Sequence, residues 1–149
     1  MNPTSDAIVQ EITIKAPAER IFEALTSPEE VLQWWWTSEG RFRITHVECD
    51  LRPGGKWMMR GTGMGEKSLT IGGEYRKIER PSLLVFTWLP DWQEDASETV
   101  VRWDLEEKAG VTTVCLTHSG FTSESARATY RGWPQILGGL QAYLEQRLP

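Results

Sequence analysis

The sequence feature that most constrains the fold is a series of alternating segments in the middle of the chain. Between residues 42 and 119, runs with apolar side chains at every second position are separated by turn-forming residues, such as those at 52–55 and 109–110. A period of two is typical of half-buried β-strands, and consecutive strands joined by short turns pair antiparallel. Together with residues 7–15, which nearly alternate, these runs predict about seven strands in one antiparallel sheet.

Such a sheet has to cover its apolar face, and helical patterns supply the cover. Two short helices are expected after the first strand, the first over residues 17–27 and the second from residue 28 toward Trp34, each with a proline suited to its first turn. A longer amphipathic stripe near the C-terminus is the only element long enough to cover the sheet. Its apolar residues are Ala126, Tyr130, Trp133, Leu137, Leu140 and Leu144.

Two features interrupt this C-terminal stripe. Pro134 removes a backbone donor and clashes with the preceding turn, so a kink or a fresh helix start is expected there. Gly138 and Gly139 each cost about 1 kcal/mol relative to alanine inside a helix. Two glycines inside a helix are therefore expected only where the structure requires them, either for a close approach of the sheet or to leave room for a ligand.

Eight of the 149 residues are tryptophan, which is unusual because an indole is bulky and its N–H needs a partner when buried. The consecutive Trp34, Trp35 and Trp36 cannot all face one core, so at least one ring is expected to face a cavity, a partner or solvent. Further large side chains fall on inward-facing positions of different strands, namely Trp57, Met59, Phe86, Trp88 and Trp103. They either pack as an ordinary core or line a ligand pocket, and the pattern leaves both alternatives open.

The two histidines, His46 and His118, are both expected on inward-facing positions. A metal site formed by them is not favoured, because no carboxylate pattern accompanies them. His118 ends a strand where a cavity would open, so acid–base chemistry with Glu74 or Tyr75 is one alternative. Nothing in the sequence sets the geometry of such a pair, and we therefore assign no catalytic residue, no metal and no cofactor.

Charge and motif content argue against several other classes of function. Lys and Arg number 16 and Asp and Glu 21, and the net charge of −5 disfavours binding along a nucleic-acid backbone. No apolar run approaches the ~18 residues that cross a bilayer, and no signal-peptide pattern is present, so a cytoplasmic protein without membrane insertion is expected. Cys49 and Cys115 stand far apart and are expected as buried, reduced thiols. Residues 61–66 are glycine-rich without matching a nucleotide-binding motif, and are expected to form a flexible hairpin loop.

Several segments, in their order along the chain, resemble the bacterial relatives of the activator of the heat-shock-protein-90 ATPase, which belong to the START-like, or SRPBCC, superfamily. They include LRPGGKW at residues 51–57 and LTHSGF at residues 116–121. The others lie at residues 16–26, 33–36, 73–75, 84–88 and 132–133. The resemblance spans nearly the whole chain, so residues 1–149 are expected to form a single domain.

The resemblance implies an α+β helix-grip fold of the START-like, Bet v-like kind. In this fold a curved antiparallel β-sheet wraps around a long C-terminal α-helix, with two short helices after the first strand and a deep cavity between sheet and helix. Members of the superfamily carry lipids and other hydrophobic molecules, cyclise polyketides or bind protein partners, so the fold alone does not choose a function. The resemblance brings no fixed catalytic set.

The leading prediction is non-enzymatic binding of a small hydrophobic ligand, aromatic or lipid-like, in the cavity between the sheet and the C-terminal helix. The residues expected to contact it are Trp35, Trp36, Trp57, Met59, Tyr75, Phe86, Trp88, Trp103, His118, Trp133 and Leu137. One alternative is a cyclase or hydrolase that uses His118. Another is a stress-related, co-chaperone-like interaction module with Trp34 to Trp36 or Trp92 as an exposed anchor. A homodimer and a chaperone partner are compatible with the sequence.

Overall fold

The computed structural model describes residues 7–35, 42–63, 67–91, 98–121 and 132–146. The elements in chain order are β1 (Ile8–Ile14), α1 (Ala18–Thr26), α2 (Pro28–Trp34), β2 (Phe42–Cys49), β3 (Lys56–Gly63), β4 (Ser68–Glu79), β5 (Leu83–Pro90), β6 (Thr99–Lys108), β7 (Val111–Ser119) and α4 (Trp133–Gln146). This order confirms the predicted succession of a strand, two short helices, a run of strands and a C-terminal helix.

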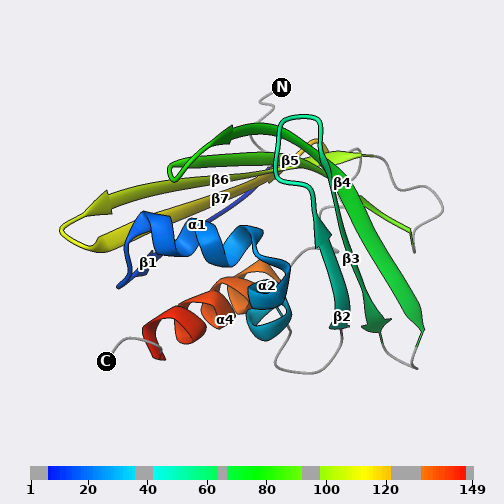
Figure 1. Cartoon of the computed structure of the whole chain (residues 1–149), viewed down its shortest axis with the longest axis horizontal. Helices are drawn as coiled ribbons and strands as arrows, with labels where there is room; N and C mark the ends of the chain where they lie inside the picture. The colour runs from blue at the N-terminus through cyan, green and yellow to red at the C-terminus, as the bar shows by residue number, and fades with distance from the viewer. Residues whose placement is uncertain (1–6, 36–41, 64–66, 92–97, 122–131, 147–149) are drawn as a thin grey trace.

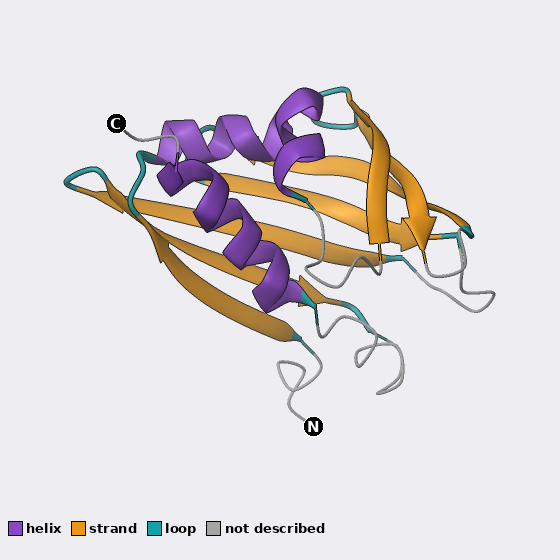
Figure 2. Ribbon diagram, turned by 90° about the horizontal axis from the view of Figure 1, so that it is seen from below, coloured by secondary structure: helices purple, strands orange, loops and turns teal. Residues whose placement is uncertain are grey.

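All the strands form one antiparallel sheet in the order β1-β7-β6-β5-β4-β3-β2. The strands from β2 to β7 meander, and β1 joins the far side by pairing with β7, Ile8 opposite His118. The sheet bends around the helices, so that β2 and β3 stand across from β1 (Figure 1). Seen from below, α1, α2 and α4 all lie on the concave face (Figure 2). The predicted helix-grip fold is therefore confirmed.

Alternation along the central strands places the apolar residues in the core as predicted. In β6, Val101, Trp103 and Leu105 are buried, whereas Arg102 between them is exposed. The same alternation holds in β3, where Trp57 and Met59 are buried, and in β7, where it ends at the fully buried His118. A period of two therefore determined which face of each of these strands is covered.

The strand β2 departs from this rule, and the prediction for His46 is wrong. Ile44 pairs with Gly61 and His46 with Arg60, so Thr45 is an extra residue in a β-bulge. The bulge shifts the alternation by one residue, which turns Val47 into the core and His46 outward. The Nε2 atom of His46 lies 2.7 Å from Oε2 of Glu48 on the outer face. The two histidines are thus on opposite faces of the sheet.

The glycine-rich segment after residue 60 is also less loop-like than expected. Gly61 to Gly63 belong to β3, and residues 64–66 lie outside the described part of the chain. A Cβ atom at Gly61 would clash with the backbone carbonyl of Arg43 on β2, so glycine permits the close pairing of these two strands here. The first half of the predicted loop is therefore strand.

The helix α4 begins at Trp133, which places Pro134 in its first turn and confirms the predicted fresh start. The stripe positions at 126 and 130 lie outside the described residues. A Cβ atom at Gly139 would lie 2.9 Å from the carbonyl oxygen of Trp34, whereas one at Gly138 would meet nothing within 4 Å. The close neighbour that requires a glycine is thus the end of α2, and not the sheet.

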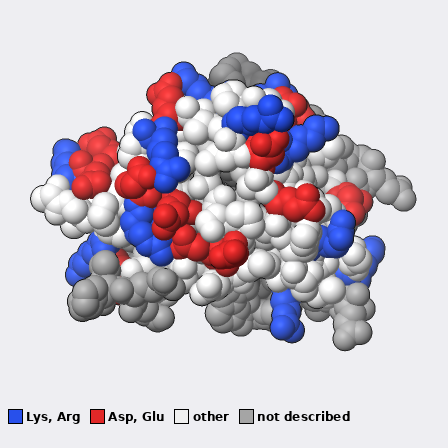
Figure 3. Space-filling model, viewed as in Figure 1, with Lys and Arg blue, Asp and Glu red and all other residues white. Residues whose placement is uncertain are grey.

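A polar network joins the three helices on their solvent side. Arg20 of α1 lies 2.7 Å from Oε1 of Glu30 on α2, and the Tyr143 hydroxyl of α4 donates to the same oxygen at 2.7 Å. Burial opposes the ionisation of Glu30, but the hydrogen bonds from Arg20 and Tyr143 outweigh it and lower the pKa of this carboxyl. Acidic and basic side chains lie side by side over α1 and α2 in Figure 3. None of the helices within the described ranges is long and apolar enough to span a membrane.

Candidate functional site

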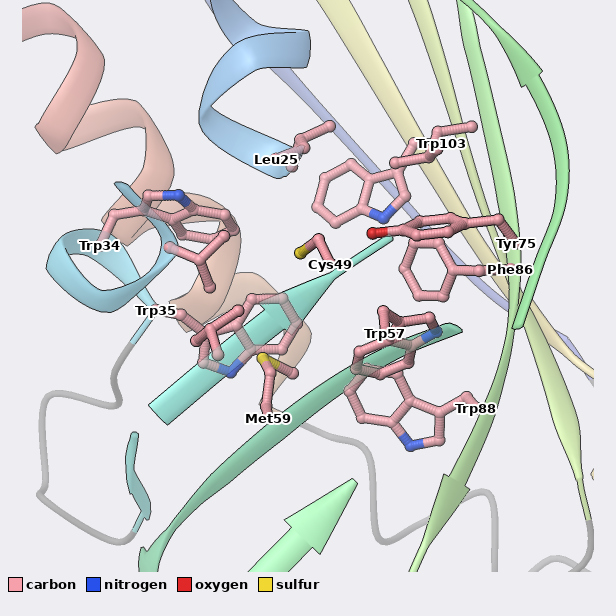
Figure 4. A pocket seen from close by; sticks show the side chains of 13 residues that line it. Leu25, Trp34, Trp35, Cys49, Trp57, Met59, Tyr75, Phe86, Trp88 and Trp103 are labelled. Atoms are coloured by element: carbon pink, nitrogen blue, oxygen red, sulfur yellow. The ribbon is translucent and has the colours of Figure 1, made fainter. Parts of the chain in front are cut away.

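A pocket lies between the concave face of the sheet and the pair of helices α1 and α2 (Figure 4). Its walls come from both helices and from β2, β3, β4, β5 and β6. The lining residues are Leu25, Val31, Trp34, Trp35, Val47, Cys49, Trp57, Met59, Tyr75, Leu84, Phe86, Trp88 and Trp103. All of these side chains are uncharged, and most are aromatic or aliphatic, as is typical of small-molecule sites.

Seven of the predicted ligand-contacting residues lie in this lining. They are Trp35, Trp57, Met59, Tyr75, Phe86, Trp88 and Trp103. His118 and Trp133 lie one layer behind, since both rings contact Trp88 without lining the pocket. Leu137 is buried in α4 and also lies outside the lining, and Trp36 lies outside the described residues.

The helix α4 contributes no lining residue to this pocket. The helices that cover it are the two short ones. The residues that sequence reasoning missed are Leu25, Val31, Trp34, Val47, Cys49 and Leu84. Leu84 shares the alternation of Phe86 and Trp88, so its signal was present. Val47 and Cys49 were not predicted because the bulge in β2 shifts the alternation by one residue, and no sequence pattern indicated this bulge.

The pocket is mostly filled by its own side chains. Its free volume is about 30 Å³, which is room for only one or two groups of the size of a water molecule, since about 10–15 Å³ on this measure holds one. Sites for drug-sized ligands measure about 300–1,000 Å³. Within the described residues, this pocket is therefore not the deep open cavity that the resemblance implied, and ring-on-ring packing fills most of it.

The rings pack in tilted and edge-to-face pairs. The Trp57 centroid lies 5.0 Å from that of Phe86 and 5.5 Å from that of Trp88. Trp35 lies 5.3 Å from Trp34, 6.0 Å from Trp88 and 5.7 Å from Trp133. Aromatic pairs favour these offset and T-shaped arrangements, so the cluster is well packed rather than merely crowded.

Two of the lining indoles are anchored by hydrogen bonds to backbone carbonyls. Trp34 Nε1 donates to the carbonyl oxygen of Ala24 at 2.9 Å, and Trp57 Nε1 donates to that of Thr87 at 3.0 Å. The second bond crosses from β3 over β4 to β5. Gly73 of β4, which pairs with Trp57, makes this crossing possible because any Cβ there would clash with both partners.

Trp35 and Trp103 differ from these anchored indoles. Among the described residues, neither Nε1–H has a hydrogen-bond partner, although Trp35 is 7% and Trp103 only 1% exposed. Trp35 directly follows α2, as its C-cap residue, so its backbone lies outside regular structure. Trp103 lies within β6, in the middle of the sheet. One of these free donors is thus at a helix end and the other deep in the core.

The two remaining polar groups of the pocket are the Tyr75 hydroxyl and the Cys49 thiol, which are hydrogen-bonded to each other. Burial, with smaller contributions from the Cys49 contact, raises the pKa of Tyr75 well above its usual range. Burial also raises the pKa of Cys49, against a smaller opposing effect of the hydrogen bond. Both groups are therefore neutral at physiological pH, and the pocket holds no ionised side chain.

His118 is held neutral behind the pocket. Trp133 Nε1 donates to His118 Nδ1 at 3.1 Å, which assigns the imidazole proton to Nε2, and Nε2 lies 2.8 Å from Thr99 Oγ1. Thr99 Oγ1 in turn donates to the carbonyl oxygen of Trp88 at 3.2 Å. Burial lowers the pKa of His118 to about 3. A neutral imidazole with both nitrogens in use is a structural element of the core.

The alternative of acid–base chemistry at His118 is not favoured by these contacts. Glu74 lies 3.4 Å from Arg76, and the Tyr75 hydroxyl bonds to Cys49. Within the described ranges, no three His, Cys, Asp or Glu side chains gather into a group that could hold a metal ion. The exposed-anchor alternative is wrong for Trp34 and Trp35, which are buried. Trp36 and Trp92 lie outside the described residues.

Comparison with known proteins places this architecture among solved structures of low sequence identity. Protein CV1439 from Chromobacterium violaceum is 21% identical over 95% of this chain and 98% of that one, with a TM-score of 0.83. An AHSA1 protein from Silicibacter pomeroyi is 18% identical, covers 95% of this chain and 99% of its own, and has a TM-score of 0.80. Protein Ms6760 from Mycobacterium smegmatis is 18% identical over 96% and 93%, also at 0.80. At this level of identity the likeness establishes the fold alone.

No curated protein matches the chain. The family model described as activator of Hsp90 ATPase homolog 1-like protein matches residues 15–145, which is nearly the whole chain and includes every residue that lines the pocket. The chain therefore belongs to the activator of Hsp90 ATPase homolog 1-like family, within the SRPBCC superfamily.

Proposed function

We propose that the protein binds a small, flat, apolar ligand in the indole-lined pocket and carries out no reaction on it. The observation that supports this most is the convergence of uncharged, mainly aromatic side chains from two helices and five strands on one pocket. Leu25 of α1 and Cys49 of β2 are the two lining residues that are only partly buried, so we expect the pocket to open near them. A ligand would enter between α1 and β2.

The free volume requires a side chain to move, and Trp35 is the one best suited. Its indole is held by ring contacts alone among the described residues, and it follows the last turn of α2. Turning it outward would leave a slot of the size of an indole beside Trp34 and Trp88. A bicyclic aromatic ring would replace the lost ring contacts, which defines the ligand by size and shape.

The energetic balance of this exchange is close to even. Exposing about 200 Å² of indole costs about 5 kcal/mol, and a ligand of equal area recovers a similar amount. Net affinity then depends on the remaining contacts and on the cost of association. We therefore expect micromolar or weaker dissociation constants for simple bicyclic ligands.

The test is protection of the Cys49 thiol from alkylation by iodoacetamide while a naphthalene-class ligand is titrated. Cys115, which lies on the outer face of β7 opposite Glu11, is the internal reference in the same molecule. Binding in the pocket slows the labelling of Cys49 saturably and leaves Cys115 unchanged. If no ligand of a broad apolar panel protects Cys49, and native mass spectrometry of fresh protein finds no bound molecule, the proposal fails.

The role of Trp35 has its own test. Trp35→Ala removes the ring that has to move, so we expect at least about tenfold tighter ligand binding, with Trp35→Leu as a milder variant if alanine destabilises too far. Leu32→Ala is the matched control, because Leu32 lies on α2 but is 41% exposed and outside the lining. Unchanged affinity in both Trp35 variants would show that another side chain opens the pocket.

Chaperone binding, homodimer formation and cytoplasmic localisation stay predictions.

A further inference from the structure

One end of the pocket is polar, and its groups come from three strands. The indole nitrogen of Trp103 on β6 and the hydroxyl of Tyr75 on β4 are directed to the same part of the pocket, with the sulfur of Cys49 on β2 beside them (Figure 4). The opposite end holds Trp35, Met59 and Trp88. One end of the pocket therefore offers the donors of Trp103 and Tyr75, whereas at the other end the N–H that lacks a partner within the described ranges belongs to Trp35, the ring that has to move.

The Trp103 N–H is the unusual group at the polar end. It is 1% exposed and has no partner among the described residues, whereas the N–H groups of Trp34, Trp57 and Trp133 all have acceptors. A buried donor without an acceptor is costly, and such groups in native proteins usually meet water or a ligand. The free volume of about 30 Å³ has room for one oxygen-sized group.

The chemistry around this donor limits the group that can approach it. No lining side chain is charged, and burial keeps Tyr75 and Cys49 neutral, as the raised pKa values of both groups indicate. A carboxylate or an ammonium would lose its hydration here without meeting an opposite charge. A neutral oxygen can accept the hydrogen bond of Trp103 and lie beside the Tyr75 hydroxyl at no such cost.

Resting on the proposed function, we infer that the ligand is a neutral aromatic ring compound of the phenol or ketone class, whose oxygen accepts a hydrogen bond from Trp103 Nε1. The ring takes the slot beside Trp34 and Trp88, and the oxygen points toward the polar end, where Trp103 Nε1 lies. Shape thus selects the ring, and the unpartnered indole donor selects the oxygen.

Three matched probes separate this inference from ligand binding as such, with Cys49 protection as the readout. They are 2-naphthol, naphthalene and 2-naphthoate, which share one ring system and differ in the polar group. We expect 2-naphthol to bind about tenfold more tightly than naphthalene, and 2-naphthoate more weakly than either. Equal affinity for 2-naphthol and naphthalene would overturn the inference and leave the proposed function standing. Failure of all three to protect Cys49 would count against the proposed function itself.

Trp103→Phe and Trp57→Phe form a matched pair of variants. Each replaces an indole of the lining by a phenyl ring, but Trp57 Nε1 already donates to Thr87. The tenfold preference for 2-naphthol should vanish in Trp103→Phe and persist in Trp57→Phe. A preference that survives in Trp103→Phe would assign the oxygen to another donor and refute the inference.

A measurement on the unaltered protein covers the case in which Trp103→Phe does not fold. In a proton–nitrogen NMR spectrum, the Nε1–H signal of Trp103 should move downfield when 2-naphthol binds, because a new acceptor deshields the proton. Naphthalene should leave it near its original position. Identical shifts with both ligands would refute the inference.

Discussion

The burial of His118 makes the stability of the protein depend on pH from about pH 6.5 downward. The pKa of this imidazole is about 3 in the folded protein and 6.5 in an unfolded chain. Below pH 6.5 the His118 imidazole binds a proton in the unfolded chain but not in the folded protein. The free energy of unfolding therefore falls as the pH falls. The folded protein takes up this proton only near pH 3, where the loss is complete.

The size of the effect follows from the two pKa values. Each pH unit between them changes the free energy of unfolding by about 1.4 kcal/mol, so lowering the pH from 7.5 to 5 should cost about 2 kcal/mol through His118 alone. The structural reason is that a second proton would sit on Nδ1, which faces the Nε1–H of Trp133 at 3.1 Å. Two donors would then oppose each other at a buried site.

Urea unfolding followed by circular dichroism at pH 7.5, 6.5, 5.5 and 5.0 measures this loss in the wild type and in His118→Asn. Asparagine can still accept from Trp133 but does not titrate, so this variant is less stable at pH 7.5 and loses about 2 kcal/mol less than the wild type on acidification. His46→Asn removes the exposed histidine instead and should keep the loss that His118 causes. Parallel pH curves for wild type and His118→Asn would refute the assignment of a buried neutral imidazole.

Three further predictions concern stability, measured by urea or thermal unfolding. Gly73→Ala should destabilise by more than about 2 kcal/mol, because a Cβ there clashes with the neighbouring carbonyl of β5 and with an anchored indole; a loss under about 0.5 kcal/mol would contradict the close strand approach. Gly138→Ala should stabilise by up to about 1 kcal/mol and Gly139→Ala should not, since only the second Cβ meets the end of α2; equal effects would be inconsistent with that contact. Glu30→Gln should cost about 1–2 kcal/mol at pH 7, and the difference from wild type should shrink as the pH falls through the lowered pKa of this carboxyl. A constant difference down to pH 3 would argue against the ion pair.

The alternation of apolar residues predicted the buried face of most strands in this protein, but not of all. Alternation in β3, β6 and β7 predicted the buried residues of each strand, since a strand that covers a core has a period of two whatever its neighbours are. For the same reason, alternation also predicted five of the lining residues, namely Trp57, Met59, Phe86, Trp88 and Trp103. In β2 the method failed, because a bulge is a property of strand pairing and leaves no mark on the alternation of a single strand.

The location and the size of the pocket could not be predicted from the sequence. Periodicity indicated which rings face inward, but not whether α4 or the pair α1 and α2 would cover them, because that depends on how closely the helices approach each other, as at Gly139. It also could not tell a wide hollow from a filled one. The difference lies in ring-on-ring contacts of about 5–6 Å between residues far apart in the chain, as between Trp35 and Trp88.

The amino-acid sequence by itself determined the order of the elements, the inward face of most strands and the family, because these depend on local spacing and on motifs along the chain. Only the tertiary structure decided which indole donors are satisfied, that His118 is neutral and that the Trp103 N–H has no partner in the part of the chain that the structure describes. Hydrogen-bond partners and burial are set by atoms from distant strands, so they exist only once the sheet has curved around its helices.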